Sequence, residues 1–466
     1  MDWVKKSVLA TGGLLALAAG AASAEEAAGD WTGLIAGQYH VVLHVTKDPA
    51  GHYGATLESP DQGTFVLTAD DVTTDPDHLS FTLAKIGAHY SGVWNADREG
   101  WVGTWTQGLT TPLVLSRMTS PTAALATPKR PQEAAIATGV LPYINAPVRF
   151  ANATVPGVTL AGTFSKPAGA GPFPAVVLMA GSGPNDRDED LMGHKLFLVL
   201  ADALNRRGMA VLRYDKRGIG ESTGTYASAT TADFTSDAAA ALAWLRTRTD
   251  VDPKRIGVLG HSEGGLIAPA VAVADPSVRF VVLMAGPGLR GDALFLKQIE
   301  LISRANGVAE ADIAKTETLS ARAFAVIEAS SDIADAKTKL EVNAARAIAA
   351  GQLTRDQADQ NIARITDPWM YAFLRYDPLP ALHQMRVPVL AINGSRDLQV
   401  EPKANLASIR AALAGDADVT VTELVGLNHL FQDAKTGSPD EYGEIEETMA
   451  PAALKTIGDW VVAHAF

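Results

Sequence analysis

The chain has 466 residues, enough for two or three domains, and apolar residues are frequent enough to build a full core. Its formal net charge is −13 at pH 7, which argues against nucleic acid or anionic membranes as partners. The absence of cysteine excludes disulfides, thiolate metal sites and a cysteine nucleophile.

The first residues have the pattern of a secretory signal. Lys5 and Lys6 precede an apolar run over 7–20, and Ala22-Ser23-Ala24 follows as a cleavage site. We therefore expect a signal peptide over 1–24, cleaved after Ala24, and an exported protein that is periplasmic or secreted. A buried N-terminal helix is the alternative. The apolar run is too short to favour a membrane span, and we expect no stable membrane insertion.

Residues 25–118 alternate between short β-rich runs, such as 39–45 and 101–105, and turn formers such as 48–51. This pattern predicts a small antiparallel β domain, either a barrel or a sandwich. Its aromatic residues suit core packing better than a binding site, and we assign no chemistry to the domain. Residues 119–135, rich in Thr, Pro and Ala, are predicted to be a linker.

Residues 136–466 have the pattern of an α/β domain that begins with a β-hairpin. Apolar strand-like runs alternate with helix-like runs, which predicts a mostly parallel sheet covered by helices on both faces. The expected strands are 175–179, 210–213, 256–259, 280–284, 389–392 and 419–424, and the expected helices are 195–207, 231–246, 264–274, 403–414 and 451–464. The alternation breaks at about 290–375, where an alanine-rich, helix-periodic insertion predicts a helical cap over the carboxyl edge of the sheet.

The most informative motif is Gly260-His261-Ser262-Glu263-Gly264, which lies between an expected strand and an expected helix. A G-x-S-x-G at such a junction is the nucleophile elbow of the α/β-hydrolase fold. The sharp turn lifts the serine hydroxyl above the sheet, and glycines are needed where side chains would collide with the backbone. We therefore expect Ser262 to be a catalytic nucleophile.

A serine hydroxyl needs a base oriented by a carboxylate, and in this fold the order is Ser, Asp or Glu, His. Asp397 follows the strand 389–392, and His429 follows the strand 419–424, so both are expected at the same sheet edge as Ser262. A turn-forming role is the alternative for Asp397. Other histidines fit the geometry less well, namely His261 inside the elbow, His383 before its strand and His464 in the last helix.

Acyl transfer also needs donors for an oxyanion. The expected backbone N–H donors are those of Glu263, after the nucleophile, and of Ser182, with Gly183 as the next choice. In the cap, Trp369 and Tyr371 are expected to line an apolar substrate pocket. Packing of the cap onto the core is an equally good use of these two aromatic residues.

Two charged clusters have alternative explanations. Residues 186–190 could bind a cation, but their carboxylates flank an arginine, which favours a loop ion-pair network. Residues 213–218 lead into a glycine-rich turn that lacks the features of a nucleotide loop, so structural ion pairing is expected. No metal or organic cofactor is expected.

Several motifs together resemble those of a known group. They are Gly181-Ser182-Gly183-Pro184, Arg213-Tyr214-Asp215-Lys216-Arg217-Gly218, the elbow, and the segments around Asp397 and Asn428-His429. In this order they are similar to bacterial α/β-hydrolases of the serine aminopeptidase-like type, which include secreted carboxylesterases with a small β domain in front. The resemblance covers about residues 140–466 and implies the fold and the triad more specifically than the substrate.

We therefore expect a serine carboxylesterase that acts on a small-molecule ester through an acyl-enzyme. The alternative within this fold is a serine peptidase or aminopeptidase, for which a carboxylate would have to hold a free amino terminus. The alternative outside catalysis is a binding protein with an inert hydrolase fold, which an intact triad argues against.

Overall fold

The computed structural model describes residues 27–35, 39–59, 66–96, 99–107, 109–118, 129–306, 308, 310–349, 355–415 and 418–466. The signal peptide predicted over 1–24 and residues 119–128 of the predicted linker lie outside these residues, so both remain predictions. The chain divides into two compact units, one up to Lys129 and one from Arg130 to Phe466. Each unit is described by itself.

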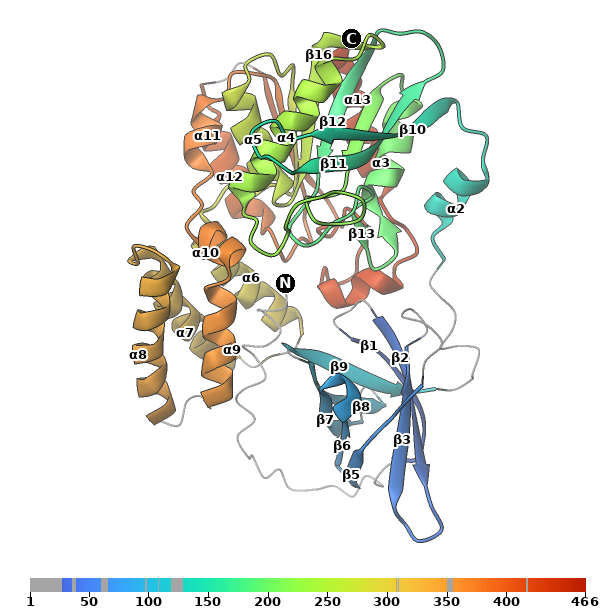
Figure 1. Ribbon diagram of the computed structural model, residues 1–466, viewed down its shortest axis with the longest axis vertical. Coiled ribbons are helices and arrows are strands. Elements are labelled where there is room, and N and C mark those ends of the chain that lie inside the picture. The colour runs from blue at the N-terminus through green and yellow to red at the C-terminus, as the bar shows by residue number, and fades with distance from the viewer. Residues whose placement is uncertain are drawn as a thin grey trace. The chain divides into compact units, whose positions relative to one another are not determined.

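The first unit is one antiparallel sheet of nine strands in the order β4-β3-β2-β1-β9-β8-β7-β6-β5 (Figure 1). Only Ala69 and Asp70 separate β4 from β5, although these are the two outermost strands. Ala69 donates its N–H to Ala55 on β3, and Asp70 donates to Thr82 on β6. The sheet therefore curls until its edges meet. The strands are β1 Gly29–Ile35, β2 Tyr39–Lys47, β3 Tyr53–Glu58, β4 Val66–Thr68, β5 Asp71–Asp75, β6 His78–Leu83, β7 Ala88–Asn95, β8 Gly100–Gln107 and β9 Leu109–Arg117.

Aromatic side chains fill the interior of this sheet. Trp31 and Trp101 are fully buried, with ring centroids 5.8 Å apart in an edge-to-face arrangement. The hydroxyl of buried Tyr90 donates to the carbonyl of Trp101 at 2.9 Å. These rings supply the core of a small unit, which is the use expected of large aromatic residues.

The second unit begins inside the segment predicted to be a linker. Helix α2 spans Pro131–Thr138, with proline at the first helical position, where it is best tolerated. Arg130 donates to the carbonyls of Met192 and Gly443, and these contacts hold the segment on the second unit. The linker prediction was therefore wrong for residues 130–135, because composition alone does not distinguish a linker from a short docked helix.

The second unit is built on an eight-stranded sheet in the order β10-β11-β15-β12-β16-β17-β18-β19. The first three strands are antiparallel, and all pairs from β15 to β19 are parallel. A mostly parallel sheet with a leading hairpin confirms the predicted fold class. The strands are β10 Tyr143–Ala151, β11 Thr159–Pro167, β12 Phe173–Met179, β15 Ala210–Tyr214, β16 Val251–His261, β17 Val281–Met284, β18 Val389–Gly394 and β19 Val419–Leu424; a short hairpin is formed by β13 Asp190–Leu191 and β14 His194–Lys195.

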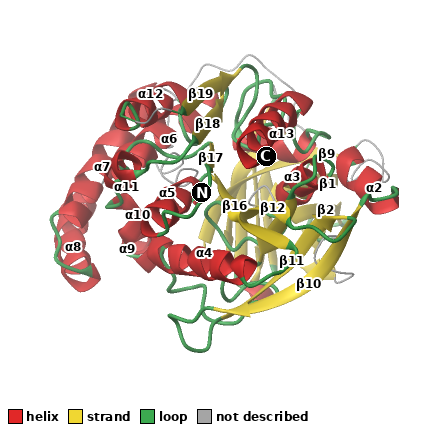
Figure 2. Ribbon diagram, turned by 90° about the horizontal axis from the view of Figure 1, so that it is seen from above, coloured by secondary structure: helices red, strands yellow, loops and turns green. Residues whose placement is uncertain are grey.

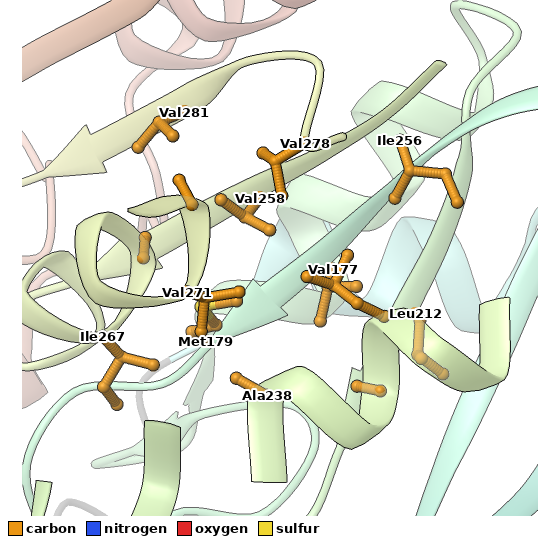
Figure 3. Close-up of a cluster of buried hydrophobic side chains, with 14 of the residues drawn as sticks. Val177, Met179, Leu212, Ala238, Ile256, Val258, Ile267, Val271, Val278 and Val281 are labelled. Atoms are coloured by element: carbon orange, nitrogen blue, oxygen red, sulfur yellow. The ribbon is translucent and has the colours of Figure 1, made fainter. Parts of the chain in front are cut away.

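Helices cover both faces of this sheet, and successive strand residues point to opposite sides. On β12, Val177 and Met179 join one buried cluster, whereas Val176 and Leu178 join the other. Figure 3 shows part of the first cluster, in which Val177 and Met179 lie among residues of β15, β16, α4 and α5. One face is covered by α4 Thr231–Arg246, α5 Gly264–Ala274, α11 Leu379–Gln384 and α12 Pro402–Ala412, and the other by α3 Leu196–Asn205 and α13 Pro451–Ala465 (Figure 2).

The cap lies between β17 and β18, as predicted, and consists of helices that belong to the second unit. Figure 1 shows α7, α8 and α9 side by side, with α6 and α10 nearer the sheet. Among the described residues, no helix combines the length and the apolar character that a membrane span requires. The cap helices are α6 Gly291–Ala305, α7 Glu310–Glu328, α8 Ile333–Ala349, α9 Arg355–Ile365 and α10 Pro368–Leu374.

Candidate active site

Ser262 occupies a sharp turn between β16 and α5. Its φ angle is +54°, in the left-handed region that side chains other than glycine rarely adopt. A Cβ at Gly260 would collide with the carbonyl of Gly264, and a Cβ at Gly264 would collide with the carbonyl of Met179. The Ser262 N–H donates to Met284 on β17 at 2.9 Å and so ties the turn to the sheet. These are the features of a nucleophile elbow.

Asp397 and His429 form a buried pair on the loops after β18 and β19. Nδ1 of His429 lies 2.7 Å from Oδ2 of Asp397. The other carboxylate oxygen accepts the backbone N–H groups of Gln399 and Val400 at 2.8 and 2.9 Å. Because a carboxylate only accepts, Nδ1 of His429 must carry the proton, which leaves Nε2 as the basic atom.

The residue before the nucleophile links the elbow to the histidine loop. Nε2 of His261 lies 3.0 Å from the carbonyl of His429, and the two imidazole centroids are 4.9 Å apart. Nδ1 of His261 lies 3.0 Å from Oε1 of Glu189, and both side chains are buried. Nδ1 of His261 faces a carboxylate and Nε2 faces a carbonyl, so these contacts favour the charged imidazolium. Burial acts to lower the His261 pKa, but the Glu189 carboxylate outweighs burial and raises it.

The loop after β12 lies against the nucleophile. A Cβ built on Gly181 would stand 3.0 Å from Cβ of Ser262. The N–H of Gly181 donates to Oε1 of Glu189 at 2.5 Å, so this group is already engaged. Within the described part of the chain, the N–H groups of Ser182 and Glu263 donate to no protein acceptor. The role of these two donors in an oxyanion hole stays a prediction.

The carboxylate of Glu263 is buried and fully engaged. Its Oε2 lies 3.1 Å from Nζ of Lys216, and its Oε1 accepts from Thr231 and from the indole N–H of Trp369, both at 2.7 Å. Trp369 therefore reaches the elbow from the cap. Tyr371 does not, because its hydroxyl contacts the carbonyl of Ser330 and accepts from Arg375 within the cap.

The charged clusters form ion-pair networks at the same sheet edge. Arg187 binds Asp215 through Nε and Nη2, and Arg213 binds Asp188. Asp186 accepts two backbone N–H groups of its own loop, from Asp188 and Asp190. This is the loop network that the sequence favours over a cation site, and in the described ranges no cluster of three or more His, Cys, Asp or Glu suits a metal ion.

Sequence reasoning missed the roles of Glu189 and Lys216, which bind groups of the elbow and of the oxyanion loop. A signal was present for Lys216, which follows strand β15 at the carboxyl edge where Ser262 and Asp397 also lie. Glu189 offered a weaker signal, since it is one of four acidic residues in five positions.

Comparison with known proteins assigns the family. The family model of X-Pro dipeptidyl-peptidases (S15 family) matches residues 156–417, more than half of the chain. The chain belongs to the S15 family. The match includes Ser262 and Asp397 and ends before His429. This S15 chain has the α/β-hydrolase fold predicted from its motifs.

Among curated proteins, the S15 chain is similar to esterase EstD of Thermotoga maritima, with 29% identity over 310 residues. The match covers 65% of this chain and 65% of that esterase, so the chain spans slightly less than two thirds of the relative's length. Among solved structures, it is similar to the Pyrococcus furiosus esterase Pf2001, at 15% identity with TM-score 0.44, over 70% of this chain and 93% of the other. The α/β hydrolase GrgF from Penicillium sp. sh18 matches at 18% identity with TM-score 0.43, over 69% and 99%.

Proposed function

We propose that this S15-family chain is a serine carboxylesterase that cleaves small-molecule esters through an acyl-enzyme. The observation that carries the proposal is the 2.7 Å contact between His429 and Asp397 beside an elbow that holds Ser262 at φ +54°. The contact between His261 and the His429 carbonyl brings the two loops together. This arrangement has the parts that nucleophilic acyl transfer requires.

In the proposed reaction, Oγ of Ser262 attacks the ester carbonyl carbon while Nε2 of His429 takes the hydroxyl proton. Asp397 holds the imidazole in the tautomer that makes this transfer possible. The N–H groups of Ser182 and Glu263 stabilise the oxyanion. The C–O bond to the alcohol then breaks, and His429 returns the proton to the leaving oxygen. Water, activated by the same nitrogen, attacks the acyl-enzyme and releases the acid and Ser262.

The preference for esters over peptides rests on the carboxylates around the nucleophile. An aminopeptidase needs an accessible carboxylate to bind the substrate's ammonium group. Glu263 is 1% exposed, and its oxygens are used by Lys216, Thr231 and Trp369. Glu189 is equally buried and binds His261 and Gly181. Neither acid can meet a substrate amine, and the similarity to a protein named as an esterase points the same way.

The S15 family name makes a peptidase the second candidate. Purified enzyme should be tested with p-nitrophenyl butyrate, an aminoacyl-p-nitroanilide and an Xaa-Pro-p-nitroanilide. We expect turnover of the ester and little or none of either anilide. Turnover of an anilide alone would reject the esterase function in favour of the peptidase.

We also propose export of this enzyme, on the basis of the charged, apolar and small-residue segments in 1–24. Expression of the full chain in a Gram-negative host should give a product in the periplasm or the medium. Its N-terminal residue by mass spectrometry should be Glu25. An unprocessed cytoplasmic product would contradict this proposal.

A further inference from the structure

The peptide bond between Gly181 and Ser182 is held firmly on its carbonyl side. The Gly181 oxygen accepts from Nζ of Lys216 at 2.6 Å and from Nδ2 of Asn185 at 2.7 Å. In a trans peptide the carbonyl and the following N–H point in opposite directions. Two donors on the carbonyl therefore fix the direction of the Ser182 N–H, which points away from Lys216 and Asn185.

Lys216 also binds the residue that supplies the second oxyanion donor. Its ammonium group lies 3.1 Å from Oε2 of Glu263 and 4.2 Å from the ring centroid of Phe234. Lys216 is 4% exposed and Glu263 is 1% exposed, so this ion pair is shielded from water. An interaction with a cation in such surroundings is much stronger and more directional than one at the surface.

The far side of the Glu263 carboxylate is bound by two other elements. Thr231 donates from the start of α4, and Trp369 donates from the start of the cap helix α10. The Trp369 ring packs on Phe373 of the same helix at 4.8 Å between centroids. The residue that follows the nucleophile is therefore fixed between the sheet edge, through Lys216, and the cap, through Trp369.

We propose that Lys216 is the positioning residue of the oxyanion hole: it orients the Ser182 N–H through the Gly181 carbonyl and the Glu263 N–H through the Glu263 carboxylate. This inference rests on the proposed hydrolase function and deepens it. Lys216 binds Gly181 and Glu263, the neighbours of the two proposed reacting groups, and is assigned no contact with the substrate in the proposed mechanism. Its effect must therefore appear in the stabilisation of the tetrahedral intermediate, and ground-state binding should change little.

The test compares the wild type with Lys216→Met, which keeps the length of the side chain and removes its donors. With p-nitrophenyl butyrate, we expect kcat to fall about 10- to 100-fold with KM changed less than about threefold, since removal of one oxyanion donor costs about 100- to 1000-fold. Inhibition by a trifluoromethyl ketone, which forms a tetrahedral oxyanion on serine, should weaken by the same factor as kcat/KM. The folded fraction is measured by near-ultraviolet circular dichroism.

The matched control is Arg217→Met, in the next position. Arg217 is also buried and paired, with Asp237, but it does not contact Gly181 or Glu263. Its loss should lower the melting temperature while kcat per folded molecule stays near the wild-type value. If Lys216→Met behaves like this control, Lys216 is only structural and the inference fails.

Two further variants keep the inference testable if Lys216→Met does not fold. Lys216→Met with Glu263→Gln removes both charges, so no uncompensated carboxylate is buried, and the same loss of kcat is expected. Asn185→Ala removes the neutral donor to the Gly181 carbonyl and should lower kcat about 3- to 10-fold. Full activity of the folded double variant overturns the inference. If the wild type hydrolyses none of the substrates, the proposed function and this inference are both wrong. If the wild type is active and Lys216→Met is fully active as well, only this inference is wrong.

Discussion

The carboxyl edge of the sheet and the helical cap use charged residues in opposite ways. At the sheet edge the pairs are buried: the side chains of Lys216 and Glu263 are 4% and 1% exposed. In the cap the pairs are at the surface: the side chains of Lys339 and Asp335 are 43% and 32% exposed. Loss of one partner leaves an uncompensated charge in the first case, whereas water replaces the partner in the second.

This difference indicates that ion pairs fix the arrangement of the loops at the sheet edge and not the arrangement of the outer cap. Buried pairs hold the loops that carry Ser182, Ser262 and His429 in one arrangement, as preorganised catalysis requires. The cap is attached mainly through its inner helices, and its outer ion pairs add little. Substitutions at the sheet edge should therefore change rate or stability strongly, and comparable substitutions on the outer cap should change neither.

The largest effect is expected for Asp397→Asn. The amide cannot hold the His429 tautomer that leaves Nε2 free, so kcat/KM for p-nitrophenyl butyrate should fall about 10³- to 10⁴-fold. Steady-state kinetics on folded protein measure this change. A loss of less than about tenfold would show that another acid orients His429.

The next effect is expected for Gly264→Ala at the elbow. A Cβ here collides with the carbonyl of Met179, and neither backbone segment can move without distorting the sheet. We expect a loss of about 3 kcal/mol or more in the free energy of unfolding, measured by chemical denaturation. The matched control is Gly415→Ala, because a Cβ at Gly415 has no neighbour within 4 Å. Equal stability of the two variants would contradict this account of the elbow.

A smaller effect that depends on pH is expected for Asp215→Asn. Burial acts to raise the Asp215 pKa, but hydrogen bonds from Arg187 and from the N–H of Glu221 outweigh burial and lower it. The carboxylate therefore stabilises the fold fully above the ordinary aspartate pKa of about 3.9, and this contribution is lost as the pH falls through the lower folded-state pKa. The variant should be about 2 kcal/mol less stable at pH 7.

Denaturant titrations of the wild type and Asp215→Asn from pH 7 to pH 3 measure this dependence. The difference in unfolding free energy should narrow below about pH 4, where Asp215 takes up a proton in the unfolded wild type while the folded carboxylate stays ionised. A difference that stays constant over the whole range would exclude the ion pair as its cause.

The smallest effect is expected for Lys339→Ala on the cap. Its partner Asp335 lies one helical turn away on α8, and both side chains are exposed to water. We expect no measurable change in melting temperature or in kcat/KM. A clear loss of stability would show that exposed ion pairs also stabilise the cap. The proposed difference between buried pairs at the sheet edge and exposed pairs in the cap would then be wrong.

Local sequence signals were sufficient to predict most of the second unit's framework. The predicted helices 231–246 and 264–274 coincide with α4 and α5. The start of α4 carries a capping box between Thr230 and Asp233, and α5 follows the elbow directly. Parallel strands buried on both faces are continuous apolar runs, which is why β12 and β18 were recognisable. The order of Ser262, Asp397 and His429 then predicted the pair that the structure brings together.

The remaining features depend on contacts between distant segments. Lys216 and Glu263 are separated by 47 positions in the sequence. The sequence alone does not distinguish a charged residue that is buried in an ion pair from one that is exposed to water. The pocket role of Trp369 and Tyr371 stays a prediction, and the sequence could not show that the Tyr371 hydroxyl contacts Ser330 within the cap. The predicted linker included residues of α2, because its few helical residues had no periodic pattern to reveal them.

The central claim is that Ser262 is the nucleophile of an esterase, and covalent labelling tests it most directly. The wild type and Ser262→Ala should be treated with a fluorophosphonate probe, digested and analysed by peptide mass spectrometry. We predict one adduct, on Oγ of Ser262, together with loss of p-nitrophenyl butyrate hydrolysis in proportion to labelling, and no adduct in the variant. An adduct on another residue, or hydrolysis that persists in Ser262→Ala, would contradict the account.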